Sequence, residues 1–401
     1  MSGSVQAPLR IAGHVGAAGK HPNLLAQGDC LGALRALGAD PRYAANVRLA
    51  YLDPPFNTGE RSRDFADDFD RADWLAFMGE RLAAAWGMLR ADGSMWVHCD
   101  DCEQAALRVL MDELFGRQSH LATVVWQRRY SRENRLAFSR TQDYIHVYAP
   151  SGSSWREHRN RLARTDKPGT WSNPDEDPRG DWSTVSLIAQ GGHATVEQDY
   201  SIELPSGRVA TPPKGSCWRV TRPRFDALTA DGLIWFGPAG NNVPRRKVFR
   251  EQAQGLVPST WWTHAEVGHN AEANAELRRL APEQAPFSTP KPERLMLRIV
   301  ELASDPGDLV LDPFAGSGTT LAVAHKAGRA WVGVELSRAT VARFTLPRML
   351  AVVEGRDGGG VTEVLDWQGG GGFAHALGPE LPAGEEPRAR SGARAPGAAS
   401  P

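Results

Sequence analysis

Residues 47–59 have the sequence VRLAYLDPPFNTG. The apolar run at its start predicts a buried β-strand, which ends at Asp53. Pro54 and Pro55 turn the backbone without providing amide donors, so nearby carbonyls stay available as hydrogen-bond acceptors. Phe56 adds an aromatic face beside these acceptors. A carboxylate, carbonyl oxygens and a flat ring together favour a planar base with an exocyclic amino group as the ligand.

Asp and Pro are also common turn residues, so this stretch alone is equally consistent with a simple turn. A second stretch, residues 308–320, also combines a buried strand with an Asp-Pro-Phe sequence: DLVLDPFAGSGTT. Gly316 and Gly318 permit close approach of a ligand, and the following helix offers free amides. The turn lacks the lysine of a nucleoside-triphosphate loop, and Leu321 replaces the third glycine of the dinucleotide pattern. These features predict a nucleoside-like cofactor that carries a carboxylate and an amine.

Glu335 ends the next predicted strand, 23 residues after Asp312. An acidic side chain at this place can accept both hydroxyls of a ribose. The alternative is an acid at the N-terminus of the following helix. Together with the glycine turn, the ribose role is favoured.

Length and composition are those of an ordinary globular protein: 401 residues, 41% hydrophobic and 23% charged. No apolar run is long enough to cross a membrane, and the N-terminus lacks the apolar core of a signal peptide. We therefore expect a cytoplasmic protein without membrane association. Four cysteines are too few for a disulfide framework, and Cys99 and Cys102 lack a second ligand pair, so we expect no metal.

Positive charge is concentrated in the middle of the chain. Residues 126–250 contain 20 Lys and Arg against 13 Asp and Glu, although the net charge of the chain is −1. A solvated basic face would explain this excess. Arginine also makes bidentate contacts to phosphate and guanine, so the following residues are candidate DNA contacts: Arg128, Arg129, Arg245 and Arg246.

Strands and helices alternate in the first and last thirds of the chain, which predicts an α/β fold with a doubly wound, mostly parallel sheet. Helical spacing predicts helices over 71–89, ended by Ala91-Asp92-Gly93, and from Ser337 to about Leu346. The middle third is irregular, with short turn-bounded strands, and is typical of an inserted module. The predicted parts are a flexible N-terminus (1–20), a first α/β half (21–149), the inserted β-rich module (150–285), a second α/β half (286–367) and a disordered tail (368–401).

With these motifs together, the sequence resembles the β group of S-adenosylmethionine-dependent DNA amino-methyltransferases. Within that group it is most similar to the modification subunits of type III restriction systems. The resemblance covers residues 24–350, and it rests on GDCLGAL, YLDPPFNTG, WLAFMGERL, GSMWVHCDD, VVWQRR, DYIHVYA, STPKPERLMLRIV, LDPFAGSGTTLAVAHKAGR and GVEL. The order of the two Asp-Pro motifs, catalytic first and cofactor loop second, implies the permuted arrangement of that group.

The resemblance implies a role for each matching residue. Asp53 and the Pro54 carbonyl would accept the two amino protons of the target base, and Phe56 would stack on its ring; Pro55 completes the catalytic motif. Asp29 would lie near the adenine of the cofactor, Lys291 at its methionine end and Glu335 at its ribose. The remaining cofactor residues would be Asp312, Phe314, Gly316, Ser317, Gly318 and Thr319.

The resemblance further implies methyl transfer to the N6 amino group of a flipped adenine in duplex DNA. Asp53 at the head of the motif favours adenine, whereas cytosine-N4 enzymes more often have Ser there; cytosine N4 remains the alternative. Phe56 replaces the commoner Tyr but keeps the stacking face. A catalytically silent DNA-binding relative is a further alternative, which the intact Asp-Pro-Pro argues against. Residues 150–285 would recognise the target, a restriction subunit is a possible partner, and a homodimer is expected by analogy.

Overall fold

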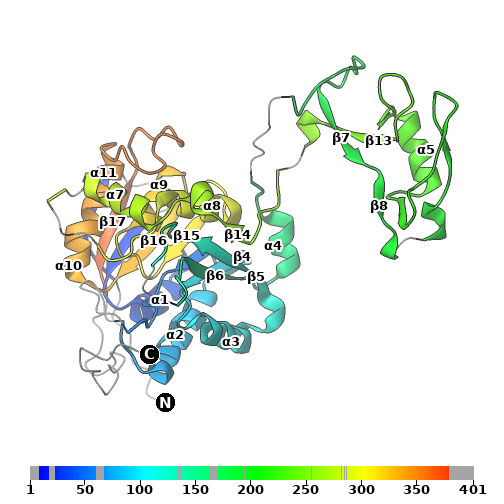
Figure 1. Cartoon of the computed structure of the whole chain (residues 1–401). Helices are drawn as coiled ribbons and strands as arrows, with labels where there is room; N and C mark the ends of the chain where they lie inside the picture. Colours follow the sequence, from blue (N-terminus) through cyan, green and yellow to red (C-terminus); the bar gives the residue numbers. More distant parts are fainter. Residues whose placement is uncertain are drawn as a thin grey trace. The chain divides into compact units, whose positions relative to one another are not determined.

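The computed structural model describes residues 9–17, 23–59, 67–133, 137–162, 169–193, 195–253, 255–280, 282–283, 285 and 287–378 (Figure 1). The chain forms two compact units. Unit 1 comprises Met1–Asn160 and Pro258–Pro401, and unit 2 comprises Arg161–Val257. The separate module is thus shorter than the expected 150–285, because segments on both sides of it are part of unit 1.

In the described residues, unit 1 is built on a ten-stranded sheet with the strand order β1-β17-β2-β16-β15-β3-β4-β6-β5-β14. The six strands from β17 to β4 in this order are parallel, whereas β1 and β6 run antiparallel to their neighbours. The strands are β1 (Arg10–Gly16), β2 (Asn23–Gln27), β3 (Val47–Leu52), β4 (Leu89–Cys99), β5 (His120–Gln127), β6 (Gln142–Tyr148), β14 (Trp261–Trp262), β15 (Leu309–Asp312), β16 (Ala330–Glu335) and β17 (Gly372–Leu377). The predicted α/β fold with a mostly parallel sheet is confirmed.

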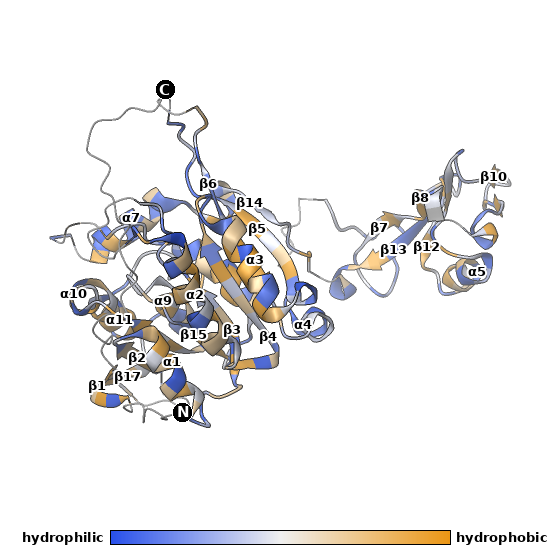
Figure 2. Ribbon diagram, turned by 90° about the horizontal axis from the view of Figure 1, so that it is seen from below, coloured by the Kyte–Doolittle hydropathy of each residue, from blue (hydrophilic) through white to orange (hydrophobic). Residues whose placement is uncertain are grey.

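Helices cover both faces of this sheet. α1, α2 and α3 pack side by side on one face, and α7, α8, α9 and α11 lie on the other (Figures 1 and 2). Strands β3 and β15 between them are buried at every residue, as expected for parallel strands covered on two sides. The helices are α1 (Cys30–Gly38), α2 (Arg71–Trp86), α3 (Gln104–Phe115), α4 (Gly152–His158), α6 (His264–Val267), α7 (Asn270–Leu280), α8 (Glu293–Ala303), α9 (Thr319–Lys326), α10 (Arg338–Thr340) and α11 (Leu346–Val353). In the described residues, no helix has the length and apolar character needed to span a membrane.

Both ends of the chain contain more structure than the composition predicted. Strand β1 lies within the N-terminal segment that was expected to be flexible, and β17 lies within the tail that was expected to be disordered. The two strands pair with each other, and β17 also pairs with β2. Phe373, Ala374 and Ala376 are buried, so the pairing is accompanied by burial of apolar side chains. These two expectations are therefore wrong for the strands; residues 379–401 lie outside the described residues.

Two predicted helix ends are also wrong. α2 ends at Trp86, and Ala91-Asp92-Gly93 lies inside β4 instead of ending the helix. The last helix does not stop before Pro347: it continues from α10 through a π-helical turn, Val341–Thr345, into α11. Pro347 lies in the first turn of α11, where a missing amide is tolerated. Such π-turns commonly occur at functional sites, and this one brings Thr345 to the glycine loop described below.

Unit 2 has its own small core, and its described residues form short strands, one α-helix and short 3-10 turns. β12, β13 and β7 form an antiparallel three-stranded sheet, β11 pairs with β8, and β10 pairs with β9. Its elements are β7 (Trp182–Ser186), β8 (Ile188–Gln190), β9 (Ile202–Glu203), β10 (Val209–Ala210), β11 (Ser216–Trp218), α5 (Arg222–Ala230), β12 (Ile234–Trp235) and β13 (Arg245–Phe249). Trp182 and Trp218 are buried, so they stabilise the unit and are not exposed stacking surfaces.

Candidate active site

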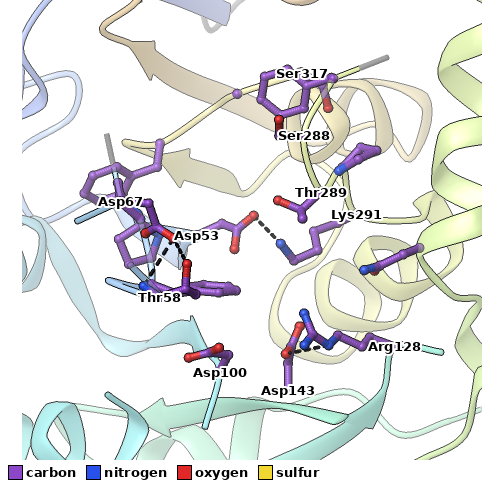
Figure 3. A pocket seen from close by; sticks show the side chains of 18 of the residues that line it. Asp53, Thr58, Asp67, Asp100, Arg128, Asp143, Ser288, Thr289, Lys291 and Ser317 are labelled. Carbon is purple, nitrogen blue, oxygen red and sulfur yellow. Dashed lines mark hydrogen bonds and ion pairs between the residues drawn. The ribbon is translucent and has the colours of Figure 1, made fainter. Parts of the chain in front are cut away.

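The carboxyl ends of β2, β3, β15 and β16 surround one cavity of about 1220 Å³, whose lining residues all belong to unit 1 (Figure 3). Ligands of open α/β sheets bind in such crevices at the carboxyl ends of the strands. The predicted site residues that line the cavity are Asp29, Asp53, Pro54, Pro55, Phe56, Arg128, Arg129, Lys291, Asp312, Phe314, Gly316, Ser317, Thr319 and Glu335. The two Asp-Pro motifs therefore share one cavity, as the sequence predicted.

Asp53 directly follows β3, and its two carboxylate oxygens have different surroundings. Oδ2 accepts a hydrogen bond from Lys291 Nζ at 2.6 Å, and the two side chains point toward each other in Figure 3. Oδ1 is buried and has no hydrogen-bond partner among the described residues. Burying an oxygen atom without a hydrogen-bond donor costs free energy, so binding of a ligand that donates a hydrogen bond to Oδ1 would be favoured.

The backbone of the Asp-Pro-Pro-Phe turn is held from two sides. The Pro55 carbonyl accepts from Trp74 Nε1 at 2.8 Å, whereas no described residue donates to the Pro54 carbonyl. Asn57 has a left-handed backbone, with φ 59°, and its amide donates to Asp67 Oδ1 at 2.7 Å. The turn thus leaves the Pro54 carbonyl beside Asp53 as a second acceptor. Asp67 was not predicted, and no motif in the sequence points to it.

Phe56 lies on a second ring that the sequence motifs did not single out. Its ring stacks on His98, with centroids 5.5 Å apart and 19° between the planes. His98 is fixed by the Tyr51 hydroxyl at 3.0 Å from Nδ1 and by Asp143 at 3.3 Å from Nε2. Burial lowers the pKa of His98, and the nearby Lys291 ammonium lowers that pKa further. A neutral imidazole therefore supports Phe56 and fixes the orientation of its ring.

The loop after β15 is shaped by two glycines with left-handed backbones. Gly316 has φ 50° and Gly318 has φ 80°. A Cβ atom at Gly316 would lie 3.4 Å from the Phe287 ring, and one at Gly318 would lie 3.2 Å from Thr345. The Thr345 hydroxyl also donates to the Gly316 carbonyl at 2.6 Å. Gly318 does not line the cavity; it forms the turn into α9 behind the loop.

Two acids flank this loop. Glu335 accepts from the amides of Gly316 at 2.9 Å and Ser337 at 2.8 Å, so its carboxylate is fixed at the end of β16. Asp312 accepts from the Phe314 amide at 2.9 Å and is buried. Burial raises the pKa of Asp312 to about 7, and the charges of Asp53 and Glu335 also act to raise it. The open backbone at the glycines and the two fixed acids suit a cofactor with a ribose and an amine. The loop itself, residues 313–320, contains no lysine that could bind a phosphate.

Asp29, which the resemblance places near the adenine of the cofactor, lines the cavity and also stabilises the fold. It caps α1 by accepting from the Gly32 amide at 2.8 Å, and it accepts from Arg81 at 2.8 Å. Arg81 is buried, lies 3.6 Å from the Phe77 ring centroid and donates to the Cys30 sulfur. No pattern in the sequence singled out Arg81, because a helical arginine is usually exposed.

The four predicted DNA-contact arginines are divided between the two units. Arg128 forms an ion pair with Asp143 at 3.2 Å and is only 17% exposed, so it also supports the ring stack below Phe56. Arg129 lines the cavity. Arg245 and Arg246 are exposed on β13, where Arg245 is oriented by the Thr184 hydroxyl at 2.7 Å. Their contact with DNA stays a prediction.

The α/β fold and a cavity that joins an Asp-Pro-Pro-Phe turn to a glycine loop define the class, and comparison with known proteins gives the family. A sequence profile for a DNA methylase family, the N6/N4 methyltransferases, matches residues 47–344. The chain belongs to this family.

The sequence identity to individual relatives is moderate. The chain is 31% identical to the Mod subunit of the type III enzyme StyLTI of Salmonella typhimurium, over 74% of this chain and 49% of that one. It is 30% identical to the type II methyltransferase M.EcaI of Enterobacter cloacae, over 75% and 65% of the two chains. A shorter match of 44%, over 20% and 27%, is to the DNA adenine methyltransferase YhdJ of Escherichia coli. The chain spans about half the length of the type III relatives it matches.

Two solved structures are also similar to this chain. One is PvuII DNA methyltransferase, which is cytosine-N4-specific; it has a TM-score of 0.45, 14% identity and coverage of 83% and 90% of the two chains. The other is the Thermus thermophilus protein TTHA0409 in complex with S-adenosyl-L-methionine, with a TM-score of 0.41, 17% identity and coverage of 88% and 99%.

Proposed function

We propose that this chain transfers a methyl group from S-adenosylmethionine to the N6 amino group of an adenine that has been flipped out of duplex DNA. The observation that carries this proposal is the buried, unpartnered Oδ1 of Asp53, beside the Pro54 carbonyl in a cavity shared with the glycine loop. Two acceptors side by side match the two protons of one exocyclic amine. Phe56 offers a ring on which the base can stack.

The cofactor supplies an electrophilic methyl group. The protein must make the amine nucleophilic, because its lone pair is delocalised into the base. Hydrogen bonds from the two amino protons to Asp53 and the Pro54 carbonyl favour a pyramidal nitrogen and direct its lone pair toward the glycine loop. The Asp53 carboxylate also stabilises the positive charge that develops on nitrogen, an effect typically of about 10²–10³-fold for one preorganised group.

Adenine is favoured over cytosine by the residue that opens the motif and by the names of relatives. Asp53 is typical of adenine-N6 enzymes, as the resemblance implies, and YhdJ is named an adenine methyltransferase. The names of the type III relatives support a restriction subunit as partner. From the family resemblance and the composition of the chain we further propose duplex DNA as substrate, recognised by unit 2, a homodimer and a cytoplasmic location.

The test is to express the chain in a host without DNA methyltransferases and to analyse the digested DNA by mass spectrometry. N6-methyladenine in the wild type and none in D53A is the expected result, and N4-methylcytosine would refute the proposed base. Single-molecule sequencing of the same DNA would give the recognition sequence.

A further inference from the structure

Lys291 contacts the catalytic carboxylate directly, although the sequence resemblance implies a place at the methionine end of the cofactor. Its Nζ lies 2.6 Å from Asp53 Oδ2, across 238 positions of sequence. The lysine side chain is 6% exposed and that of Asp53 is 22% exposed. The same ammonium lies 5.2 Å from the ring centroid of Phe56, within the range of a cation–π contact. Lys291 thus lies where the proposed acceptor meets the proposed stacking ring.

We propose that Lys291 is a positioning residue for the target base: it holds Oδ2 of Asp53 so that Oδ1 is left to accept the target amine. This inference rests on the proposed function. A carboxylate that is free to rotate could present either oxygen. One held by a short charge-assisted hydrogen bond presents one oxygen to the lysine and the other to the base.

The negative charge of the cavity gives Lys291 a second task. Asp53, Asp312 and Glu335 all line the cavity, and an ammonium group beside Asp53 offsets part of this concentration of acidic groups. Arg128, another cation of the cavity wall, is already paired with Asp143. Among the described residues, Lys291 is the cation that forms an ion pair with Asp53.

The test compares K291M, which keeps the length of the side chain, with K291R, which keeps its charge. R117M is the control, because Arg117 is an exposed cation of unit 1 that does not line the cavity. Single-turnover methylation is measured at saturating cofactor and DNA, and cofactor affinity is measured by calorimetry. In K291M we expect a loss of about 10²-fold in rate, with cofactor affinity within about threefold of wild type. K291R should recover part of the rate.

Three results would overturn the inference. The first is a cofactor affinity at least tenfold weaker in K291M with a normal saturated rate, which would assign Lys291 to the cofactor. The second is a saturated rate that stays unchanged in K291M or falls equally in R117M. The third needs no activity: in a double-mutant cycle of D53N and K291M, additive shifts in Tm would show that the two side chains are not coupled. A coupled cycle together with wild-type protein that makes no methylated DNA would refute the proposed function and leave the ion pair intact.

Discussion

The buried carboxyl of Asp312 predicts a pH-dependent stability that the substitution D312N should remove. The pKa of this carboxyl is raised from an ordinary 3.8 to about 7, first by burial and then by the charges of Asp53 and Glu335. The folded protein therefore binds a proton that the unfolded chain has lost between about pH 4 and 7. Stability from this group is fully present below pH 4 and is lost as the pH rises through 7. The asparagine side chain of D312N is uncharged and can still accept the Phe314 amide hydrogen bond, so the variant lacks this dependence.

The size of the effect follows from the shift. A change from 3.8 to about 7 is roughly 3 pH units, and each unit corresponds to about 1.36 kcal/mol. Between pH 4 and 8.5, the free energy of unfolding of D312N should thus rise relative to wild type by up to about 4 kcal/mol. This is a large fraction of the total stability of a typical domain.

Urea unfolding of the cofactor-free proteins at pH 4.5, 6.5 and 8.5 measures this difference. Glu276 is a matched control, because burial and the Glu293 charge raise its pKa to about 7 as well. Glu276 titrates in both the wild type and D312N, so its contribution cancels in the difference between their free energies of unfolding. Introducing E276Q into both proteins should therefore leave that difference unchanged. A difference between D312N and wild type that stays constant with pH would refute the raised pKa of Asp312 and its role as a buried acid.

Three further variants test the site and the DNA surface. D53A should lower the single-turnover methylation rate by at least about 10²–10³-fold while cofactor binding measured by calorimetry is retained; full residual activity would remove Asp53 from the mechanism. G316L should prevent cofactor binding, since a φ of 50° is strained for leucine and its Cβ atom would already lie 3.4 Å from the Phe287 ring, and an unchanged affinity in a folded variant would contradict the placement of the cofactor. R245A/R246A should weaken DNA binding and reduce the slope of log affinity against log salt by about 0.9 per lost phosphate contact, whereas an unaltered slope would return both arginines to a solvated surface.

The sequence predicted the parts of the site that lie on one continuous segment. In each Asp-Pro motif, a buried strand, an acid and a turn follow one another, so local patterns alone place Asp53 and Asp312 at strand ends. Because parallel strands end at the same edge of a sheet, both acids were expected in one crevice, and the structure has them in one cavity. The position of Glu335, the acid expected to bind the ribose, follows from the same rule, since β16 is the neighbour of β15.

Features that depend on distant pairing were missed for a physical reason. The Gly/Ala-rich composition of residues 1–20 predicts flexibility and the Gly/Ala/Pro-rich tail predicts disorder, but β1 and β17 pair with each other, β17 also pairs with β2, and Phe373 is buried. Similarly, Arg128 has the appearance of a DNA contact in the sequence, but Asp143, 15 residues later, lies across the β5–β6 pair and forms an ion pair with it. A charge pattern gives the number of cationic side chains in a segment, but it does not show which of them already form ion pairs within the protein.

The chain order also explains why the Asp53–Lys291 pair could not be found from either motif. β3 and β15 are neighbours in the sheet although unit 2 and the segments flanking it separate them in sequence, so the catalytic turn after β3 meets the segment that leads into α8. α8 packs against α9, the helix that follows the glycine loop, which ties Lys291 to the cofactor half of the fold. An ion pair between Lys291 and Asp53 therefore joins the two halves across the cavity.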